Sequence, residues 1–247
     1  MLLDERRAGI RDLVRDRGFA TLSDLADAVG ASESTVRRDL DFLTEAGELR
    51  RTRGGAAAVD PLSVRQPLDK ALAQKQAIAK AAAGLIGDGE TILIDGGTTT
   101  LELARHLVGK RLQIVTNSLP IMQLLSGADG IELVCLGGVL HSQTGVLLGP
   151  MTTAALERLH VRRTVMGTGG VLESGLFNSN SLLVETERQM IAAADETVVL
   201  ADAEKFGHSE LVRLCGLDDV DRLVTDSRLG NDWRRTLRSA GVDVRVV

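Results

Sequence analysis

The stretch Ser32-Glu33-Ser34-Thr35-Val36-Arg37-Arg38-Asp39-Leu40 has the residue order of an amphipathic helix with a charged outer face. Its first residue, a serine, can accept a hydrogen bond from the unpaired first-turn amides and so begin the helix. Apolar residues recur at i, i+4 and i+7 on one face, and polar residues occupy the opposite face. The apolar face is Val36, Leu40 and Leu43, and the polar face is Ser34, Arg37, Arg38 and Asp41. This polar face either reads DNA or is the solvated charged face of an ordinary helix.

The arginines of this helix are suited to DNA, because a guanidinium reaches guanine edges and phosphates bidentately. Bulk charge gives no support: residues 1–55 hold ten arginines and eleven acids, and the whole chain has a net charge of −5. Any DNA contact must therefore depend on where the arginines lie rather than on how many there are.

The residues around this stretch complete a larger motif. A first helix is expected over 3–17, and a second helix capped by Thr21, with Asp24 in a capping box, ends at Gly30. Two helices joined by a short turn containing glycine are typical of a helix-turn-helix. The third helix is expected to end at Gly47. Residues 48–55 then predict a hairpin whose arginines could grip phosphate or a minor groove, namely Arg50, Arg51 and Arg53.

Composition excludes several classes of protein. Of the 247 residues 44% are apolar and only 2% aromatic, which excludes an aromatic surface that stacks on single-stranded nucleic acid. The two cysteines, Cys135 and Cys215, lie in apolar surroundings and predict neither a disulfide framework nor a zinc site. The chain shows no signal peptide and no run of about 20 apolar residues. We therefore expect a cytoplasmic protein with no membrane contact, metal or cofactor.

The remainder of the chain predicts a linker and then an α/β domain. Pro61 and Pro67 interrupt any periodicity, and a helix is expected from about Lys75 to Ile86. Short, continuously apolar strands then alternate with helices, as in a largely parallel sheet covered on both faces. The expected strands are 91–95, 113–116, 132–136, 163–167, 197–201, 223–225 and 242–246.

Polar or glycine-rich segments follow nearly every predicted strand, where ligands of open α/β sheets bind. The strongest is Asp95-Gly96-Gly97-Thr98-Thr99-Thr100, which follows a strand and opens a helix, as a phosphate cradle does. The alternative is an ordinary strand-to-helix turn. The others are Asn117-Ser118, Gly137-Gly138, Gly167-Thr168-Gly169-Gly170 and Asp202-Ala203-Glu204-Lys205. Lys205 could neutralise a phosphate or form an exposed pair with Asp202. Neither a P-loop nor a dinucleotide fingerprint is present.

Motifs in both halves resemble those of the DeoR family of bacterial transcription regulators. The N-terminal motifs are Arg6, Ile10, Val14, Ser32-x-x-Thr35-Val36-Arg37-Arg38-Asp39-Leu40 and Gly47-Glu-Leu-x-Arg-x-x-Gly-Gly-Ala. The C-terminal motifs are 89–100, Val115-Thr-Asn-Ser118, Leu136-Gly-Gly138, Gly149-Pro150, Gly175-Leu176, Glu185 and Asp202-x-x-Lys205-Phe206-Gly207. The resemblance covers nearly the whole chain.

The resemblance implies three segments. Residues 3–58 would be an α+β winged helix-turn-helix domain, 59–74 a linker, and 75–247 an effector-sensing and oligomerisation domain of α/β fold resembling ribose-5-phosphate isomerase. The DNA-binding residues would be Ser32, Ser34, Thr35, Arg37, Arg38, Arg50, Arg51 and Arg53. A phosphorylated sugar or related effector would contact Asp95, Gly96, Gly97, Thr98, Thr99, Thr100, Asn117, Ser118, Gly137, Gly138, Asn180, Glu185, Asp202 and Lys205. Asp39 would orient an arginine rather than read a base, and the Thr35 hydroxyl could instead be satisfied within its own helix.

The chain departs from the common family pattern at several of these places. Gly169 stands where many members have Asp, Glu187 where Lys is common, and His141 where Arg is common. The segment Phe177-Asn178-Ser179-Asn180 replaces Thr-Thr-Pro-Asn. Losing an acid and a lysine should change which ligand groups the site prefers, so no effector identity is carried over. His141 could bind phosphate or titrate, although a lone histidine beside a loop usually does neither.

These observations favour a transcriptional regulator, most simply a repressor of a carbohydrate-metabolism operon, rather than an enzyme. Its partners would be double-stranded operator DNA, a small phosphorylated metabolite and further copies of the chain, in a dimer or tetramer. One alternative is a phosphosugar-processing enzyme that uses Asp95, Glu185, Asp202 and Lys205 as acids and bases. The other is a metabolite-binding module without operator specificity.

Overall fold

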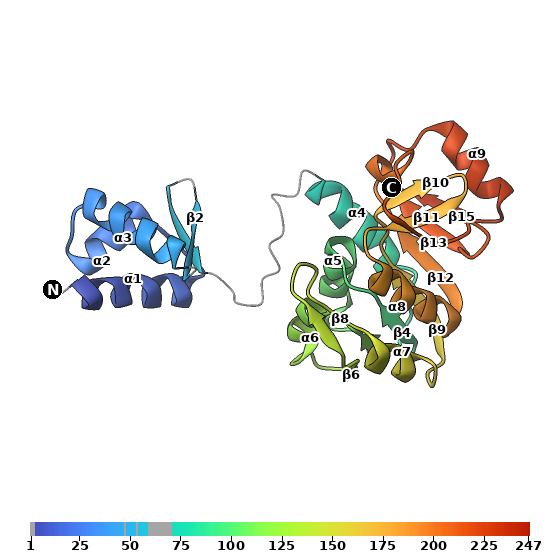
Figure 1. Cartoon of the computed structure of the whole chain (residues 1–247), viewed down its shortest axis with the longest axis horizontal. Helices are drawn as coiled ribbons and strands as arrows, with labels where there is room; N and C mark the ends of the chain where they lie inside the picture. Colours follow the sequence, from blue (N-terminus) through green and yellow to red (C-terminus); the bar gives the residue numbers. More distant parts are fainter. Residues whose placement is uncertain (1–2, 47, 53, 59–70) are drawn as a thin grey trace. The chain divides into compact units, whose positions relative to one another are not determined.

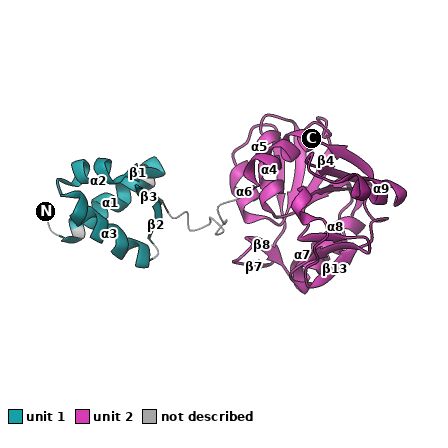
Figure 2. Ribbon diagram, turned by 90° about the horizontal axis from the view of Figure 1, so that it is seen from above, with its two compact units in different colours: residues 1–63 teal, residues 64–247 magenta. Residues whose placement is uncertain are grey.

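A computed structural model of the chain describes residues 3–46, 48–52, 54–58 and 71–247. The chain divides into two compact units, residues 1–63 and 64–247 (Figure 2). Three expectations fall outside the described residues: the helix end at Gly47, the wing residue Arg53, and most of the linker 59–74.

The first unit combines helices with a small antiparallel sheet of strand order β1-β3-β2 (Figure 1). Its elements are α1 Leu3–Arg17, β1 Phe19–Thr21, α2 Leu22–Val29, α3 Glu33–Glu45, β2 Leu49–Thr52 and β3 Gly55–Ala58. Thr21 forms the predicted capping box with Asp24, and Gly30 ends α2 in the left-handed conformation, with φ of 61°. The apolar faces of the helices meet in one core that includes Ile10, Leu25, Val36, Leu40 and Leu43.

Strand β1 was not predicted from the sequence. It pairs with β3 so that Ala20 lies opposite Ala56 and Thr21 opposite Gly55. A side chain at Gly55 would lie 2.1 Å from the carbonyl oxygen of Ala20, so only glycine permits this close approach. The wing is therefore one part of a three-stranded sheet that also fixes the start of α2.

The second unit is built on a seven-stranded sheet of order β15-β14-β12-β9-β4-β5-β6. All neighbouring strands in it are parallel. Its strands are β4 Thr91–Ile94, β5 Leu112–Thr116, β6 Ile131–Cys135, β9 Val161–Met166, β12 Ala194–Leu200, β14 Arg222–Thr225 and β15 Asp243–Val246. Each corresponds to one of the seven predicted strands, with ends that shift by at most three residues. The predicted fold class, a winged helix-turn-helix followed by a parallel α/β domain, is confirmed.

Helices cover both faces of this sheet because alternate strand residues point to opposite sides. The helices are α4 Leu72–Ala83, α5 Thr98–Leu107, α6 Leu119–Leu125, α7 Pro150–Leu156, α8 Ser181–Ala192, η1 Ala203–Lys205 and α9 Asn231–Ser239. On one face Ile92 and Ile94 pack with residues of α4, α5 and α6. On the other face Leu93 packs with residues of α7, α8 and α9. Helix α4 begins at Leu72, three residues before the expected Lys75, so the end of the predicted linker is helical.

Two smaller sheets were not predicted. One is the antiparallel pair β7 Val139–His141 and β8 Val146–Leu148, and the other is β10 Gly170–Leu172, β11 Gly175–Asn178 and β13 Val212–Cys215. Cys215 is half-buried, but Cys135 is exposed at the edge strand β6, which differs from the apolar surroundings expected for it. No described helix is long and apolar enough to cross a membrane.

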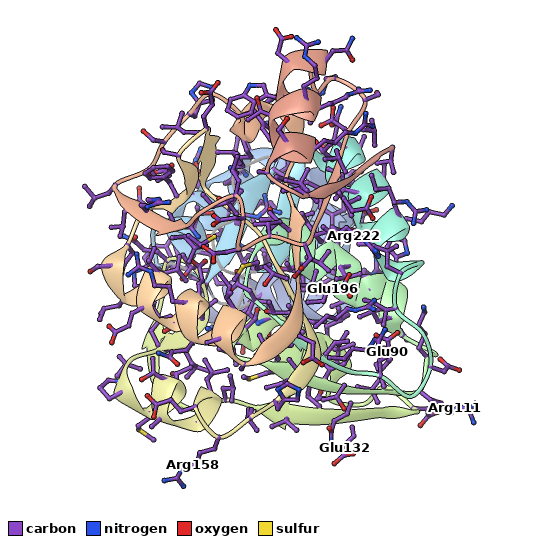
Figure 3. All side chains as sticks on the ribbon, turned by 90° about the vertical axis from the view of Figure 1, so that its right-hand side faces the viewer. Glu90, Arg111, Glu132, Arg158, Glu196 and Arg222 are labelled. Atoms are coloured by element: carbon purple, nitrogen blue, oxygen red, sulfur yellow. The ribbon has the colours of Figure 1, made fainter. Side chains whose placement is uncertain are left out.

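A row of alternating charges crosses the amino edge of the large sheet. Arg163 of β9 lies with Nε 3.4 Å from Glu90 and Nη2 3.1 Å from Glu196. Arg222 of β14 continues the row, with Nη1 3.6 Å from Glu196 and Nε 2.9 Å from Asp243. Glu90, Glu196 and Arg222 follow one another along the sheet in Figure 3. Arg163 is buried and also donates to the carbonyl oxygen of Leu85. This row joins the amino ends of five strands.

Candidate DNA-binding face and effector site

Helix α3 begins with a cluster of hydroxyls. Ser32 Oγ accepts a hydrogen bond from the backbone N–H of Thr35 at 3.3 Å, which confirms Ser32 as the N-cap. The same oxygen lies 2.9 Å from the hydroxyls of both Ser34 and Thr35. The Thr35 hydroxyl is thus engaged within its own helix, as the simpler interpretation of that residue expected. Ser34 is exposed at the surface of the helix.

Asp39 fixes α3 to α1. Its carboxylate is buried and accepts hydrogen bonds from Arg6 Nε at 2.6 Å and from Arg7 Nε at 3.0 Å. Burial opposes ionisation, but these two hydrogen bonds outweigh it and hold the pKa of the Asp39 carboxyl below its ordinary value. The Arg7 guanidinium also lies 3.7 Å above the ring centre of Phe42. Asp39 therefore orients arginines, as expected, and these are Arg6 and Arg7.

Arg37 and Arg38 lie on the other side of α3, and both are exposed. Neither guanidinium has an ion-pair partner within 4 Å among the residues that the structure describes. The buried face holding Val36 and Leu40 keeps the helix in place, so both guanidiniums project from a rigid support. This is the arrangement that base or phosphate contact requires.

The wing arginines differ from one another. Arg50 is exposed on β2, whereas Arg51 is half-buried with its Nε 3.5 Å from Asp41 of α3. Arg51 thus connects the wing to the recognition helix, while Arg50 remains available for phosphate. Arg53 lies outside the described residues.

The carboxyl edge of the large sheet brings together most of the predicted effector residues. Asp95 follows β4 directly and is 2% exposed. Burial raises the pKa of its carboxyl to about 7, against the opposing hydrogen bonds from the backbone N–H groups of Gly96 and Gly167. Its Oδ1 has no hydrogen-bond partner among the described residues.

The segment after Asp95 has the geometry of an anion site. Helix α5 begins at Thr98, and no side chain caps it, so its first amides remain available. Lys75 Nζ of α4 donates a hydrogen bond to Thr98 Oγ1 at 2.8 Å. Thr100 is fully buried and donates to the carbonyl oxygen of Gly97 at 3.1 Å, and Thr99 is buried beside it. Lys75 was not recognised from the sequence, because a lysine at the start of a helix usually marks only a solvated face.

Packing explains two of the predicted glycines. A side chain at Gly96 would lie 2.0 Å from Val146 of β8, and one at Gly138 would lie 2.3 Å from the Thr152 hydroxyl. By contrast, only Met151, at 3.9 Å, comes close to the side-chain position of Gly137. The glycines at 96 and 138, which follow β4 and β6, therefore allow the β7–β8 hairpin and α7 to pack closely. This role is separate from any contact with a ligand.

Asn117 and Ser118 occupy the end of β5 and are both buried. Asn117 Nδ2 donates to the carbonyl oxygen of Leu147 at 3.0 Å, and this bond identifies its other amide atom, Oδ1, as an acceptor. That Oδ1 has no hydrogen-bond partner in the described part of the chain. Since Ile94 lies opposite Thr116 in the β4–β5 register, Asp95 and Asn117 are the next residues on neighbouring strands.

Helix α8 contributes a residue that the sequence analysis noted only as a departure. Glu187 is 1% exposed, whereas Glu185, the predicted site residue, is exposed on the same helix. Asn180 caps α8 by accepting from the amides of Leu182 and Leu183. The helical period could have shown the burial, because Glu187 lies three residues after Val184 and three before Met190, which are both buried.

Three of the departures form one connected group. Asn178 Nδ2 donates to both oxygens of Glu187, at 2.6 and 2.7 Å, and its Oδ1 accepts from the backbone N–H of Gly169 at 2.5 Å. A side chain at Gly169 would lie 2.8 Å from that Oδ1, so the Asp common at this position does not fit. Burial raises the pKa of Glu187 to about 8, helped by the charge of Asp95 and opposed by Asn178. Both carboxyls are connected to the segment that follows β9, Asp95 by the backbone N–H of Gly167 and Glu187 through Asn178 to Gly169.

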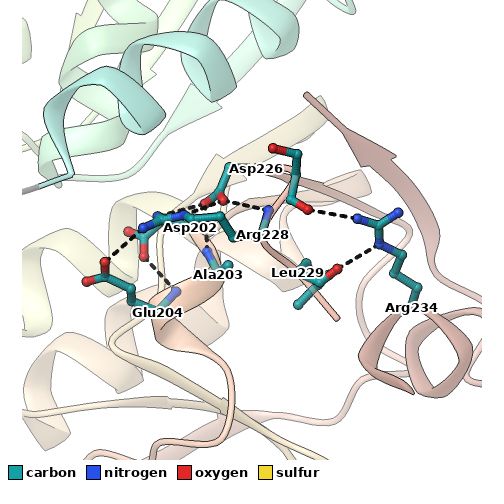
Figure 4. Close-up of polar contacts among 8 residues, drawn as sticks. Asp202, Ala203, Glu204, Asp226, Arg228, Leu229 and Arg234 are labelled. Atoms are coloured by element: carbon teal, nitrogen blue, oxygen red, sulfur yellow. Dashed lines mark hydrogen bonds and ion pairs between the residues drawn. The ribbon is translucent and has the colours of Figure 1, made fainter. Parts of the chain in front are cut away.

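The segment after β12 is held by a second network, drawn in Figure 4. Asp226 accepts from the backbone N–H of Ala203 at 2.9 Å and from Arg228 Nε at 2.7 Å, and Arg228 reaches Glu204 at 3.0 Å. Asp202 is buried and caps η1 through the amide of Glu204. The contacts do not pair Lys205 with Asp202, or with any other described acid within 4 Å.

Two further side chains have defined contacts. His141 lies in β7, with Nδ1 2.8 Å from the Thr144 hydroxyl of the same hairpin. Trp233 of α9 packs against the core, and its ring meets that of Phe206 edge-on with centroids 5.4 Å apart. No described group of three or more His, Cys, Asp and Glu side chains could hold a metal ion.

Comparison with known proteins identifies the class of protein. The DeoR-like helix-turn-helix domain matches residues 6–61, and the DeoR C terminal sensor domain matches residues 70–227, more than half of the chain. The chain belongs to the DeoR family of transcriptional regulators. The expectation of a DNA-binding regulator rather than an enzyme is thereby confirmed.

Individual relatives agree with this assignment. The uncharacterized HTH-type transcriptional regulator YulB of Bacillus subtilis is 32% identical, over 100% of this chain and 98% of that protein. The HTH-type transcriptional repressor GlcR of the same organism is 32% identical over 100% and 97%. Among solved structures, ribose 5-phosphate isomerase A of Methanocaldococcus jannaschii is similar with a TM-score of 0.39 and 23% identity, over 53% of each chain. Likeness at that level carries no functional information.

Proposed function

We propose that this DeoR-family protein is a repressor of a carbohydrate-metabolism operon, and that a phosphorylated sugar or related metabolite changes its affinity for operator DNA. One observation supports the DNA-binding face above all others. Arg37 and Arg38 are exposed without an acidic partner among the described residues, on a helix whose opposite side is fixed by Asp39. We assign DNA contact to Ser32, Ser34, Thr35, Arg37, Arg38, Arg50, Arg51 and Arg53.

For the effector we propose the residues at the carboxyl edge of the large sheet. The uncapped start of α5, with Lys75 beside Thr98, is suited to a phosphate group. The remaining polar residues would contact the rest of the ligand, and they follow β5, β6 and β12 or lie on α8. The proposed set is Asp95 to Thr100, Asn117, Ser118, Gly137, Gly138, Asn180, Glu185, Asp202 and Lys205, and we add Lys75 and Glu187 to it because of their positions.

We further propose that residues 3–58 form the DNA-binding domain, 59–74 the linker and 75–247 the effector-sensing and oligomerisation domain, and that the protein acts in the cytoplasm. A single small winged domain binds DNA weakly, so we expect a homo-oligomer, dimer or tetramer, on a symmetric or repeated operator. Sedimentation velocity of the full chain tests this; a monomer at micromolar concentration would exclude it.

The test of DNA recognition is fluorescence anisotropy with DNA from the region upstream of the protein's own gene. Arg37→Ala and Arg38→Ala should each weaken selective binding by about 1–3 kcal/mol, or about 5- to 150-fold, if each guanidinium reads a guanine. Arg158→Ala is the matched control, because it removes the same charge from an exposed position of the other unit. Unchanged affinity in both α3 variants would show that this face does not read DNA.

The effector is tested by adding phosphorylated sugars to the same complex. A repressor of this kind must bind the effector with different affinities in its DNA-bound and DNA-free states. The coupling free energy between effector and DNA binding should be about 1–3 kcal/mol. A compound that shifts operator affinity by this amount would support the proposal. Selective DNA binding without a response to any phosphorylated metabolite would contradict the effector assignment.

A further inference from the structure

The carboxyl edge of the large sheet holds two buried carboxyl groups, and no described cation lies within 4 Å of either. Asp95 is 2% exposed and Glu187 is 1% exposed. Among the described residues, no lysine, arginine or histidine lies within 4 Å of either carboxyl. The amide of Asn178 supports Glu187 from behind by donating to both of its oxygens. Two acids in one buried place are costly unless a proton or a cation is shared between them.

Two neighbouring acceptor atoms are also without partners. Asp95 Oδ1 and Asn117 Oδ1 are buried and accept no hydrogen bond from any described group. The two residues follow matched positions of β4 and β5, since Ile94 lies opposite Thr116. Buried acceptors without donors are rare and call for an explanation, most directly a ligand that is absent here. The Asn117 oxygen does not belong to the acid pair, and it points to the same place.

The ionised carboxylates of Asp95 and Glu187 and the Asn117 oxygen can only accept hydrogen bonds, so a ligand that binds the ionised pair must donate them. A primary ammonium group has three donors, no acceptor and one positive charge. A sugar hydroxyl offers one donor and no charge, and it would leave the acid pair uncompensated. The chemistry therefore favours an ammonium group over a hydroxyl.

We propose that the effector is a small phosphorylated amine of the amino-sugar phosphate class, whose ammonium group is bound by Asp95, Glu187 and Asn117. The inference rests on the proposed effector function of this site. The phosphate would lie at the start of α5, only three residues beyond Asp95, where Lys75 donates to Thr98. The ligand's ammonium group would thus lie beside the carboxylates, and its phosphate beside Lys75 and the first amides of α5. Glu187 sets the preference for the amine, and the anion site is shared with phosphosugars that lack one.

The experiment compares pairs of ligands that differ only at one group. Glucosamine, galactosamine and mannosamine 6-phosphates are titrated by calorimetry into the full-length protein, each beside the sugar phosphate that has a hydroxyl in place of the amine. At least one amine should bind about 10- to 150-fold more tightly than its hydroxyl counterpart, the range expected for hydrogen bonds to a charged group.

Variants then locate the preference. Glu187→Gln keeps the size of the side chain and removes its charge, so the ratio between amine and hydroxyl should fall to within about threefold. Asp95→Asn should reduce the ratio as well. Glu173→Gln is the control, because Glu173 is exposed in the β10–β11 turn and should leave the ratio unchanged. An unaltered ratio in Glu187→Gln would overturn the assignment to this residue.

Other outcomes separate this inference from the function on which it rests. Equal binding of amine and hydroxyl ligands, or preference for the hydroxyl, overturns the inference and leaves the effector function intact. Tight binding of the hydroxyl ligand only when Mg²⁺ is added shows that the acid pair is a metal-ion site, and the inference is then wrong. Binding of no phosphorylated compound overturns the effector function as well.

Discussion

The two edges of the large sheet treat charge in opposite ways. At the amino edge, Arg163 and Arg222 alternate with acids so that each charge lies 3.1–3.6 Å from an opposite one, although Glu90 Oε2 and Arg163 Nε form no hydrogen bond. At the carboxyl edge, neither Asp95 nor Glu187 has a described cation within 4 Å, and Asn117 Oδ1 accepts no hydrogen bond from a described group. Both edges belong to the same strands, so the difference is not one of fold. It indicates that the amino edge is completed by the chain itself, whereas the carboxyl edge is completed by something that binds.

The largest effect should come from breaking the amino edge. Arg163→Met removes the buried guanidinium that Glu90 and Glu196 share and leaves these half-buried acids only their longer contacts with Arg162 and Arg222. The free energy of unfolding should fall by about 3 kcal/mol. Urea unfolding monitored by Trp233, the chain's one tryptophan, measures this in the second unit. A loss below about 1 kcal/mol would mean that the row of charges is not what holds this edge.

A smaller loss is expected from removing support at the carboxyl edge. Asn178→Ala removes the donor to both Glu187 oxygens and the acceptor for the Gly169 amide, at a cost of about 1–3 kcal/mol. The same unfolding experiment measures it. If a phosphorylated amine binds as proposed, its addition should recover part of that loss. A cost as large as that of Arg163→Met would remove the contrast between the two edges.

The next effect in size is the pH dependence of the free energy of unfolding, which should come from the two carboxyls of the carboxyl edge. Burial raises the pKa of Glu187 to about 8 and that of Asp95 to about 7, while unfolded carboxyls titrate near 4. Between these values the folded state holds more protons, so the free energy of unfolding should fall as pH rises from about 5 to 8. Each carboxyl contributes at most about 1.4 kcal/mol per pH unit. Glu187→Gln should reduce this slope and Glu173→Gln should not.

The groups around Glu187 do not alter that sign. Asp95 adds like charge, Asn178 is neutral, and burial raises the pKa of the neighbouring Cys215 thiol to about 12, so the thiol stays uncharged. Unfolding measured from pH 5 to 8 in wild type and variant checks the prediction. Stability that rises with pH over this range would contradict it.

The smallest effect is expected at the exposed end of the charge row. Asp243 is 67% exposed at its side chain, and its pair with Arg222 is screened by water. Asp243→Asn should therefore cost about 0.2–1 kcal/mol, and added salt should reduce the difference. A cost like that of Arg163→Met would show that exposure does not govern the strength of this row.

Most of the architecture was predictable because it depends on local patterns. The seven sheet strands are continuous apolar runs, and Thr21, Gly30 and Ser32 mark helix ends by the chemistry of their side chains. Strand β1 was missed because three residues give no period, and its pairing partner β3 lies more than 30 residues away. The β10–β11–β13 sheet was missed because its strands have only three or four residues, and β13 lies more than 30 residues after β11.

The sequence predicted where the candidate site lies, but not which of its side chains form hydrogen bonds with one another. Strand ends located Asp95, Asn117 and Asp202, because parallel strands bring their carboxyl ends to one edge. Glu187 was recorded as a departure from the family pattern, but its burial follows only from how α8 packs. Asn178 and Gly169 show why: each is unremarkable alone, and the hydrogen bonds that join them to Glu187 depend on three separate elements.

Asp39 has a consequence for how the first unit can be shortened. A fragment that starts after Arg7 would retain the whole helix-turn-helix motif, α2 and α3, and so would look like a complete DNA-binding unit. It would also bury a carboxylate that has lost both of its counterions. Successive residues of a helix point about 100° apart, so Asp39, Arg38 and Arg37 turn together when the helix rotates. A rotation of α3 that exposes the Asp39 carboxylate would therefore move Arg37 and Arg38 away from the groove. The orientation of α3 about its own axis thus depends on Arg6 and Arg7, which lie some thirty residues earlier in the chain.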